Sequence, residues 1–271
     1  MVGNPPDAAG LETTLMGCAL RFTDARQVAV TGATATIKID GQVVEGAVVQ
    51  GQMLEGRGLE GAASVGHVSA ARVSEGRALG GRVFEVPAGA VLDVGRATRG
   101  VRSYVAVAGG IAVEPTLGSR STDTLSGLGP PKLAADMTLP LGPVPVPPGP
   151  VPSATPVDKS DGELVLGVWL GPRDDWFASG ELFASSYTVS PVSNRVGTRL
   201  VGAALRRTQA GELPSEGVVL GAIQVPADGQ PLIFLADHPT TGGYPVIGVV
   251  DDVTALAQAR PGTKVRFRGL D

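Results

Sequence analysis

The stretch 211–247 reads Gly211-Glu212-Leu213-Pro214-Ser215-Glu216-Gly217, continues with Gly221-Ala222-Ile223-Gln224-Val225-Pro226, and ends with Ala236-Asp237-His238-Pro239-Thr240-Thr241-Gly242-Gly243-Tyr244-Pro245-Val246-Ile247. Short apolar runs alternate here with corners marked by glycine and proline. The corners hold the Glu, Gln, Asp, His and Tyr side chains, which are the groups able to do chemistry. Polar groups at strand ends are typical of a small β-barrel with a site at its mouth.

The composition of the whole chain agrees with a β-rich fold. Its 271 residues are enough for one large all-β domain or two smaller ones. Hydrophobic residues make up 43% and aromatic residues only 4%, so the core must consist mostly of Val, Leu, Ile and Ala. The 39 glycines and 22 prolines occur in a chain whose mean hydropathy is +0.18, so they punctuate many short strands.

Charge and cysteine content exclude several classes of function. The net charge is −4 and no basic run is present, which disfavours nucleic acids and anionic membranes as partners. A single cysteine, Cys18, excludes an internal disulfide framework and a cysteine-rich zinc site, and two histidines are too few for a His-rich metal centre. No apolar run reaches the length of a membrane span and no signal peptide begins at Met1, so we expect a cytoplasmic protein.

The order of apolar runs predicts two β-domains. The expected strands of the first half are 11–15, 27–31, 35–39, 42–44, 86–95 and 101–111, with a hairpin turn at Asp40-Gly41. Those of the second half include 164–170, 187–190, 198–202, 246–250 and 264–267, with short helices at 174–183 and 253–259. Residues 45–84 are predicted to be an irregular insertion. We therefore place a first domain at 1–140, a proline-rich linker at 141–157 and a second domain at 158–271.

No nucleotide-binding loop is present in the sequence. Gly109-Gly110 ends a predicted strand, and a turn that needs positive φ explains the pair better than phosphate binding does.

The candidate catalytic residues are Glu216, Asp237 and His238. A carboxylate beside an imidazole can fix the tautomer of the ring and raise its pKa, so Asp237 and His238 form a candidate acid–base pair. Adjacent strand residues point to opposite faces, however, and the two would cooperate only in a turn. Glu216 is either a buried acceptor for a substrate N–H or a solvated or capping group.

The candidate substrate-binding residues are three arginines and the polar residues of the stretch 211–247. Arg195 and Arg199 lie four residues apart around a glycine corner and either present guanidinium forks to a carboxylate or form surface ion pairs. Arg120 is a similar candidate. The run Thr240-Thr241-Gly242-Gly243-Tyr244 offers hydroxyls, backbone amides and a phenol, which suit an anion- or amide-binding loop as well as a turn.

Several motifs, taken in order, resemble the biotin-dependent carboxyltransferase family, which includes the C subunit of 5-oxoprolinase, allophanate hydrolase subunit 2 and the antagonist of the KipI kinase inhibitor. The motifs are Gly3-Asn4-Pro5-Pro6-Asp7-Ala8-Ala9-Gly10-Leu11-Glu12, Gly95-Arg96-Ala97-Thr98-Arg99-Gly100 before Tyr104-Val105-Ala106-Val107-Ala108-Gly109-Gly110-Ile111, Leu117-Gly118-Ser119-Arg120-Ser121-Thr122-Asp123, Tyr187-Thr188-Val189-Ser190-Pro191, Asn194-Arg195-Val196-Gly197 and the stretch 211–247. Family members usually carry a further segment before the first motif, which the resemblance implies would add strands to the first domain.

The resemblance implies an all-β fold of two cyclophilin-like β-barrels and a hetero-oligomer with a KipI-like B subunit and a LamB/YcsF-like A subunit. It implies ATP-dependent opening of 5-oxoproline to glutamate, with ATP bound at the level of the complex. The alternatives are an allophanate hydrolase or biotin-dependent carboxyltransferase acting on a urea-like substrate, and a non-catalytic regulatory subunit. All the substrates share a planar amide, whose polarisation needs fixed donors and an acceptor. Suitable side chains are those of Glu216, Gln224, Arg195, Thr241 and Tyr244.

Overall fold

The computed structural model describes residues 2–44, 82–144 and 162–270. The chain is divided into two compact units. Unit 1 comprises Met1–Arg99, Ser103–Ala112 and Leu139–Pro156, and unit 2 comprises Gly100–Arg102, Val113–Thr138 and Val157–Asp271. The segment 113–138, which precedes the predicted linker, thus clusters with the second half of the chain. Most of the expected insertion at 45–84 and most of the linker at 141–157 lie outside the described residues.

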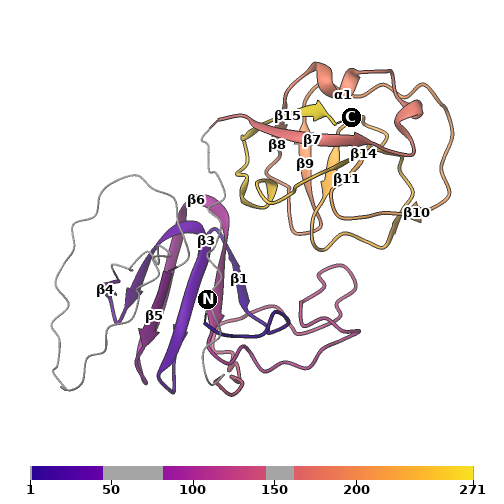
Figure 1. Ribbon diagram of the computed structural model, residues 1–271. Helices are drawn as coiled ribbons and strands as arrows, with labels where there is room; N and C mark the ends of the chain where they lie inside the picture. The colour runs from indigo at the N-terminus through magenta and orange to yellow at the C-terminus, as the bar shows by residue number, and fades with distance from the viewer. Residues whose placement is uncertain (1, 45–81, 145–161, 271) are drawn as a thin grey trace, which may run out of the picture. The chain divides into compact units, whose positions relative to one another are not determined.

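Unit 1 is built on a six-stranded sheet with the central order β1-β6-β3-β4, to which β2 adds through β6 and β5 through β3. The bounds of these strands are β1 Leu11–Thr14, β2 Cys18–Arg21, β3 Arg26–Ile39, β4 Gln42–Val43, β5 Arg82–Val86 and β6 Val91–Val107. The two long strands β3 and β6 run antiparallel along the sheet (Figure 1). Val28, Leu92 and Val94 are fully buried, so the core is aliphatic, as the composition predicts.

The hairpin predicted at Asp40-Gly41 is confirmed. Lys38 pairs with Val43 across the turn, and both turn residues have positive φ, 48° at Asp40 and 80° at Gly41. Positive φ at both central positions is the geometry that matches the twist of two antiparallel strands. The predicted strand 86–95 is wrong as a single element, because Pro87 and Gly89 form a turn between β5 and β6. Gly89 adopts a φ of 80°, which a continuous strand does not allow.

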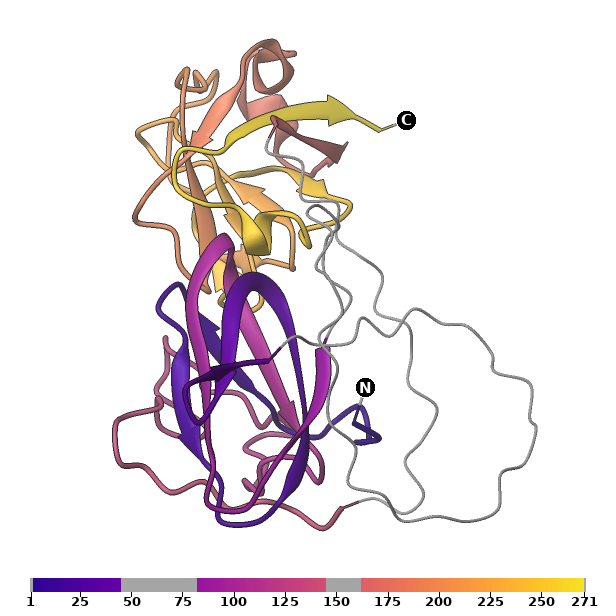
Figure 2. The same ribbon diagram turned by 90° about the vertical axis from the view of Figure 1, so that its left-hand side faces the viewer.

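Unit 2 contains a closed seven-stranded barrel in the order β11-β12-β9-β8-β15-β7-β14 (Figures 1 and 2). Its strands are β7 Leu164–Leu170, β8 Tyr187–Val189, β9 Gly197–Val201, β11 Ala222–Gln224, β12 Leu232–Phe234, β14 Val246–Val250 and β15 Lys264–Gly269. The pair β7 and β15 is parallel and joins the first and last strands of the unit, while the other neighbours are antiparallel. Ile223, Ile233 and Val265 have no exposed surface and fill the interior. The all-β prediction is confirmed.

The helices of unit 2 are shorter than predicted. Instead of one helix over 174–183, a 3-10 turn η1 spans Asp174–Trp176 and a single turn α1 spans Glu181–Ala184. Phe177 is extended between them, and Gly180 has a φ of 78°. A left-handed residue interrupts an α-helix, so the acidic start predicted the first turn only. The second expected helix shrinks to the 3-10 turn η2 at Leu256–Gln258.

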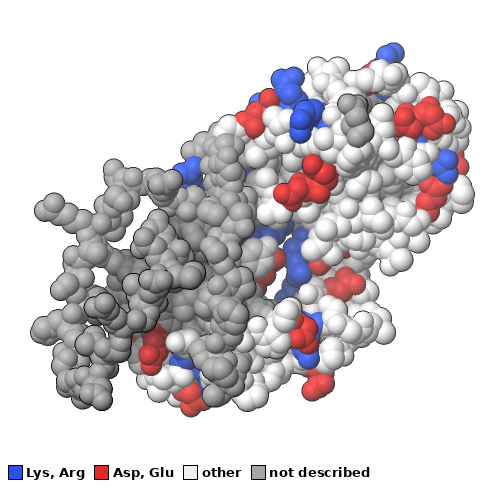
Figure 3. All heavy atoms as spheres, in the orientation of Figure 1, with Lys and Arg blue, Asp and Glu red and all other residues white. Residues whose placement is uncertain are grey.

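None of the helices among the described residues has the length and apolar character required to cross a bilayer. On the face that Figure 3 shows, acidic and basic side chains are scattered over a mostly uncharged surface.

Candidate functional site

A second apolar cluster lies on the outside of the barrel. Along β11, β12 and β14 the inward positions belong to the main core. The alternate side chains Ala222, Leu232, Phe234 and Val246 form a separate cluster with Val218, which follows β10, and Val196 packs against it. Alternation in a strand sends successive side chains to opposite faces. These three strands are therefore buried on both faces, and the outer face is covered by the loops that carry most of the predicted site residues.

Gln224 is a buried polar residue on this outer face, only 4% exposed. It pairs with Leu232 on β12 and with Val246 on β14, both members of the outer cluster. Its Nε2 donates a hydrogen bond of 3.0 Å to the backbone oxygen of Tyr244. The buried Gln224 side chain thus fixes the loop that precedes β14 through this hydrogen bond, while the side chain of Tyr244 remains half exposed.

A two-stranded ribbon crosses this region. It consists of β10 Glu216–Gly217 and β13 Thr241–Gly242, and Glu216 stands directly opposite Gly242. A Cβ atom at Gly242 would lie 2.5 Å from Nε2 of Gln224, so the glycine permits the ribbon to approach the buried amide. Residues directly opposite in an antiparallel pair project to the same face. The side chain of Glu216 therefore lies on the face of the ribbon that is turned toward Gln224.

Glu216 forms a salt bridge with Arg173, a residue that was not among the candidates predicted from the sequence. Nε of Arg173 donates to Oε2 of Glu216 at 3.1 Å, and Nη2 donates to Oε1. These two hydrogen bonds from the guanidinium lower the pKa of Glu216, and the carboxylate in turn raises the pKa of Arg173. Both side chains remain about one-third exposed, at 33% and 29%. Glu216 is thus an ionised, oriented carboxylate at the edge of the barrel.

A second charged cluster gathers around Arg195. Its Nη2 lies 3.1 Å from Oδ1 of Asp237, whose side chain is only 7% exposed. The hydroxyl of Thr124 donates to the other carboxylate oxygen at 3.3 Å, and Nη1 of Arg195 donates to the backbone oxygen of Thr122 at 3.4 Å. The cluster therefore ties the segment 122–124 to the corner after β12.

The neighbouring Asp123 belongs to a local turn. It accepts hydrogen bonds from the hydroxyl of Ser126 at 2.6 Å and from the backbone N–H of Leu125 at 2.8 Å. These bonds, with Arg195 nearby, lower the pKa of Asp123.

Among the described residues, the side chains of Asp237 and His238 form no hydrogen bond with each other, because each has another partner. Asp237 is engaged by Arg195 and Thr124, whereas Nδ1 of His238 lies 2.7 Å from the backbone oxygen of Pro239. A carbonyl oxygen only accepts, so Nδ1 must carry the proton and the neutral ring has its lone pair on Nε2. The ring lies 6.1 Å from that of Phe234. The geometry gives the imidazole a defined tautomer without help from Asp237.

Two further arginines were predicted as substrate-binding. Nε of Arg120 donates to the backbone oxygen of Val113 at 3.1 Å, which places it within its own loop. Arg199 pairs with Leu232 across β9 and β12, so it shares the outer face with Gln224, two strands away or about 10 Å. Within residues 2–44, 82–144 and 162–270, the Arg199 guanidinium forms no ion pair, and its side chain is exposed.

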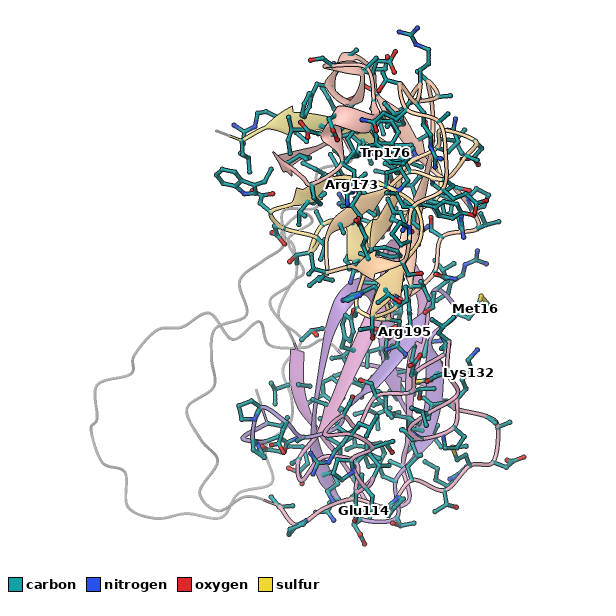
Figure 4. The ribbon with its side chains drawn as sticks, turned by 90° about the vertical axis from the view of Figure 1, so that its right-hand side faces the viewer. Met16, Glu114, Lys132, Arg173, Trp176 and Arg195 are labelled. Atoms are coloured by element: carbon teal, nitrogen blue, oxygen red, sulfur yellow. The ribbon has the colours of Figure 1, made fainter. Side chains whose placement is uncertain are left out.

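The predicted residues thus fall into two groups on the same unit. Glu216, Gln224 and the loop 240–244 come together around the ribbon, and Arg195 joins Asp237 at the corner after β12. Figure 4 shows Arg173, which belongs to the first group, well separated from Arg195. Arg173 and Thr124 were missed because each is distant in sequence from its acidic partner, by 43 and 113 residues. Arg173 follows the predicted strand 164–170 and precedes an acidic turn, which is the one local signal that the sequence offered.

The turn at Gly109-Gly110 is confirmed as structural. The two glycines have φ values of 95° and 70°. A Cβ atom at Gly109 would lie 2.3 Å from the backbone oxygen of Gly142, so another chain segment fills the space beside the turn.

The barrel of unit 2 is closed and carries a second apolar cluster outside its main core. The family described as "Carboxyltransferase domain, subdomain A and B" matches residues 1–63 and 54–269. The chain therefore belongs to this carboxyltransferase-domain family, as the motifs indicated.

Three relatives give the family its context. The chain is 32% identical to the 5-oxoprolinase C subunit of Escherichia coli over 98% of its own length and 77% of the relative. It is 29% identical to the urea amidolyase of Saccharomyces cerevisiae, of which it covers 14%. The crystal structure of TTHA0988 matches with a TM-score of 0.74 and 31% identity, over 98% of this chain and 46% of that one. The chain thus spans about half of that solved structure, and its named relatives are enzyme subunits or parts of larger enzymes.

Proposed function

We propose that this chain is the C subunit of an ATP-dependent 5-oxoprolinase-type amidohydrolase, which opens 5-oxoproline to L-glutamate together with a partner. The relation to the 5-oxoprolinase C subunit over nearly the whole chain supports this choice of reaction. The observation that carries it is the ribbon of unit 2, where Arg173 holds Glu216 as an oriented carboxylate beside the loop 240–244.

The chemistry of a lactam explains these groups. A ring N–H needs an acceptor, and the Glu216 carboxylate supplies one. The hydroxyls of Thr240, Thr241 and Tyr244 are exposed at the same loop and are donors for the lactam oxygen. As the carbonyl oxygen is activated, positive charge develops at the nitrogen, and a fixed anion stabilises that charge more than the ground state.

Arg199 suits the carboxylate that 5-oxoproline carries. Its guanidinium is exposed and shares the outer face with Gln224, whereas Arg195 is neutralised by Asp237. A planar guanidinium binds carboxylates with two hydrogen bonds. We therefore assign recognition of the substrate carboxylate to Arg199, and support of the segment 122–124 to Arg195.

The remaining parts of the reaction belong to other subunits in this proposal. The sequence contains no nucleotide-binding loop, and no step of ATP chemistry is assigned to this chain. A KipI-like B subunit and a LamB/YcsF-like A subunit would supply the nucleotide site and the rest of the active site. In the overall reaction the ring C–N bond breaks, and one water supplies the carboxylate oxygen and the two protons that convert the ring N–H into an ammonium group. A second water is consumed as ATP is hydrolysed to ADP and phosphate.

The family match favours a second candidate, carboxyl transfer to a urea-like substrate. The ureido ring of biotin is also a planar amide, so Glu216 and the hydroxyls of the loop 240–244 fit it too. Biotin that is already carboxylated on its ureido ring would supply the carboxyl group when bound. This reaction requires a biotinylated carrier and is blocked by avidin, which separates it from ring opening.

Glutamate release by the complex with the A and B subunits tests the proposal. We expect release that depends on ATP and 5-oxoproline and is insensitive to avidin. Arg199→Ala should raise KM for 5-oxoproline at least tenfold with little change in kcat, while Arg206→Ala, which removes a distant exposed ion pair with Glu181, should change neither. Assembly without turnover would instead support a regulatory role, and avidin-sensitive carboxylation of urea would support the transferase.

A further inference from the structure

Arg173 is anchored to the barrel through its own backbone. Its N–H donates to the oxygen of Val246 at 3.1 Å, and the N–H of Gly171, two residues earlier, donates to the oxygen of Ile247 at 2.9 Å. Its carbonyl accepts the N–H of Trp176 at 3.2 Å in the turn η1. The backbone of Arg173 is therefore fixed beside Val246, the first residue of the barrel strand β14.

Glu216 has a weaker anchor of its own. It belongs to the two-residue strand β10, which pairs with the equally short β13. The flanking residues Gly211, Glu212, Pro214 and Ser215 are exposed. A ribbon of this length does not fix a side chain by itself. The pair with Arg173 therefore supplies a direct link from the carboxylate to the barrel wall.

The link has a directional geometry. Nε and Nη2 of the guanidinium each donate to a different oxygen of the Glu216 carboxylate. A planar fork of this kind fixes the plane of the carboxylate as well as its position, which an ammonium group cannot do. Asp175, in the turn η1, is the other charged group that acts on the guanidinium.

We infer that Arg173 is the positioning residue for Glu216: it orients the carboxylate, so that Glu216 serves as an acceptor for the substrate N–H. This role rests on the function proposed above. Arg173 itself does not touch the substrate. Its effect on turnover must therefore pass entirely through Glu216.

A double-mutant cycle in the assembled complex tests this dependence, because groups that act through one another have non-additive effects. We expect Arg173→Met to lower kcat for 5-oxoproline at least tenfold in the wild-type background. In the Glu216→Gln background the same change should have no further effect. Arg173→Lys should recover only part of kcat, because the charge returns without the fork.

Arg266 provides the matched control. It forms an Arg–Glu pair with Glu163 through Nε at 2.9 Å on the separate strand β15, and the two side chains are 49% and 33% exposed. Arg266→Met should shift the melting temperature about as much as Arg173→Met does and leave kcat unchanged. Equal losses of kcat from Arg173→Met in both backgrounds, or full activity of Arg173→Met, would overturn the assignment.

A measurement that needs no turnover keeps the inference separate from the proposed reaction. The carboxyl group of Glu216 can be titrated by NMR in the wild type and in Arg173→Met. We expect its pKa to rise in the variant, and an unchanged pKa would contradict the positioning role. A wild-type complex that releases no glutamate, with the pKa rise intact, would refute the reaction and leave the positioning of Glu216 standing.

Discussion

Tyr187 is a buried residue whose hydroxyl has no hydrogen-bond partner in the part of the chain that the structure describes. The residue has no exposed surface and packs against Phe267 with ring centroids 5.6 Å apart. Its hydroxyl is buried without a hydrogen-bond partner among the described residues, and this burial raises its pKa to about 12. A buried polar group without a partner costs free energy that an apolar group of the same shape does not.

We therefore expect Tyr187→Phe to leave the free energy of unfolding unchanged or to raise it by up to about 1 kcal/mol. Phe267→Ala, which empties part of the same core, should lower it by about 3–5 kcal/mol. Urea denaturation followed by fluorescence measures both. A loss of more than about 1 kcal/mol in Tyr187→Phe would mean that the hydroxyl has a partner in solution.

The ion pair of Glu216 should make the free energy of unfolding depend on pH. The guanidinium of Arg173 lowers the pKa of Glu216 in the folded state. A lowered pKa means that the unfolded chain binds the proton more readily, so the contribution to stability is present above the ordinary carboxyl pKa of about 4.3 and is lost as the pH falls through the folded value.

The stability difference between the wild type and Glu216→Gln should thus be largest near neutral pH and shrink as the pH falls below that value. Urea midpoints measured across the acidic range, with Glu212→Gln as the control at an exposed site on the same loop, check the sign. A difference that grows toward low pH would contradict an ionised Glu216.

The sequence pattern predicted those strands and turns whose formation depends mainly on residues close together in the chain. The alternating runs gave the strands β7, β8, β9, β14 and β15 close to their bounds, and Asp40-Gly41 gave the hairpin. The expected helix over 174–183 was too long because Gly180 adopts a left-handed conformation, which composition alone does not reveal.

The same holds for the candidate site: residues with a local sequence signal were predicted, and residues placed by long-range packing were not. The loop 240–244 and Glu216 stood out in the sequence as polar corners, and their pairing in a ribbon brings them together. Arg173 and Thr124 did not stand out, because their partners are set by tertiary packing across 43 and 113 residues. Gln224 is buried by the second apolar layer outside the barrel, and a period of two cannot distinguish that layer from a solvent-facing surface.

The turns of unit 1 offer a prediction at the same scale. Gly89 and Gly109 both have positive φ, at 80° and 95°, but nothing lies within 4 Å of a Cβ atom at Gly89. Gly89→Ala should cost roughly 1–2 kcal/mol from the left-handed backbone alone. Gly109→Ala should cost more than about 3 kcal/mol, because the methyl group would also collide with the backbone oxygen of Gly142. Equal losses in thermal unfolding would show that this contact relaxes freely.

At the scale of the molecule, the two units have different kinds of sheet. Unit 1 is a six-stranded sheet built on two long antiparallel strands, and unit 2 is a closed barrel of short strands. The segment 113–138 clusters with the barrel, where Arg195 and Asp237 hold residues 122–124. The barrel unit thus draws on the sequence of both halves.

The proposed reaction also belongs to the whole molecule and its partners. The named relatives are subunits or portions of larger enzymes, and this chain contributes a carboxylate acceptor, exposed hydroxyls and an arginine to the proposed site. We expect the wild-type chain to assemble with the A and B subunits, and we expect Glu216→Gln to assemble equally well, because a partly exposed ion pair contributes little to the fold.

The most direct test of the central claim is the rate of L-glutamate release from 5-oxoproline and ATP by complexes that contain either the wild type or Glu216→Gln. We expect ATP-dependent release by the wild-type complex and at least a hundredfold lower kcat with Glu216→Gln. Equal rates from the two complexes, or no release from an assembled wild-type complex, would contradict the claim.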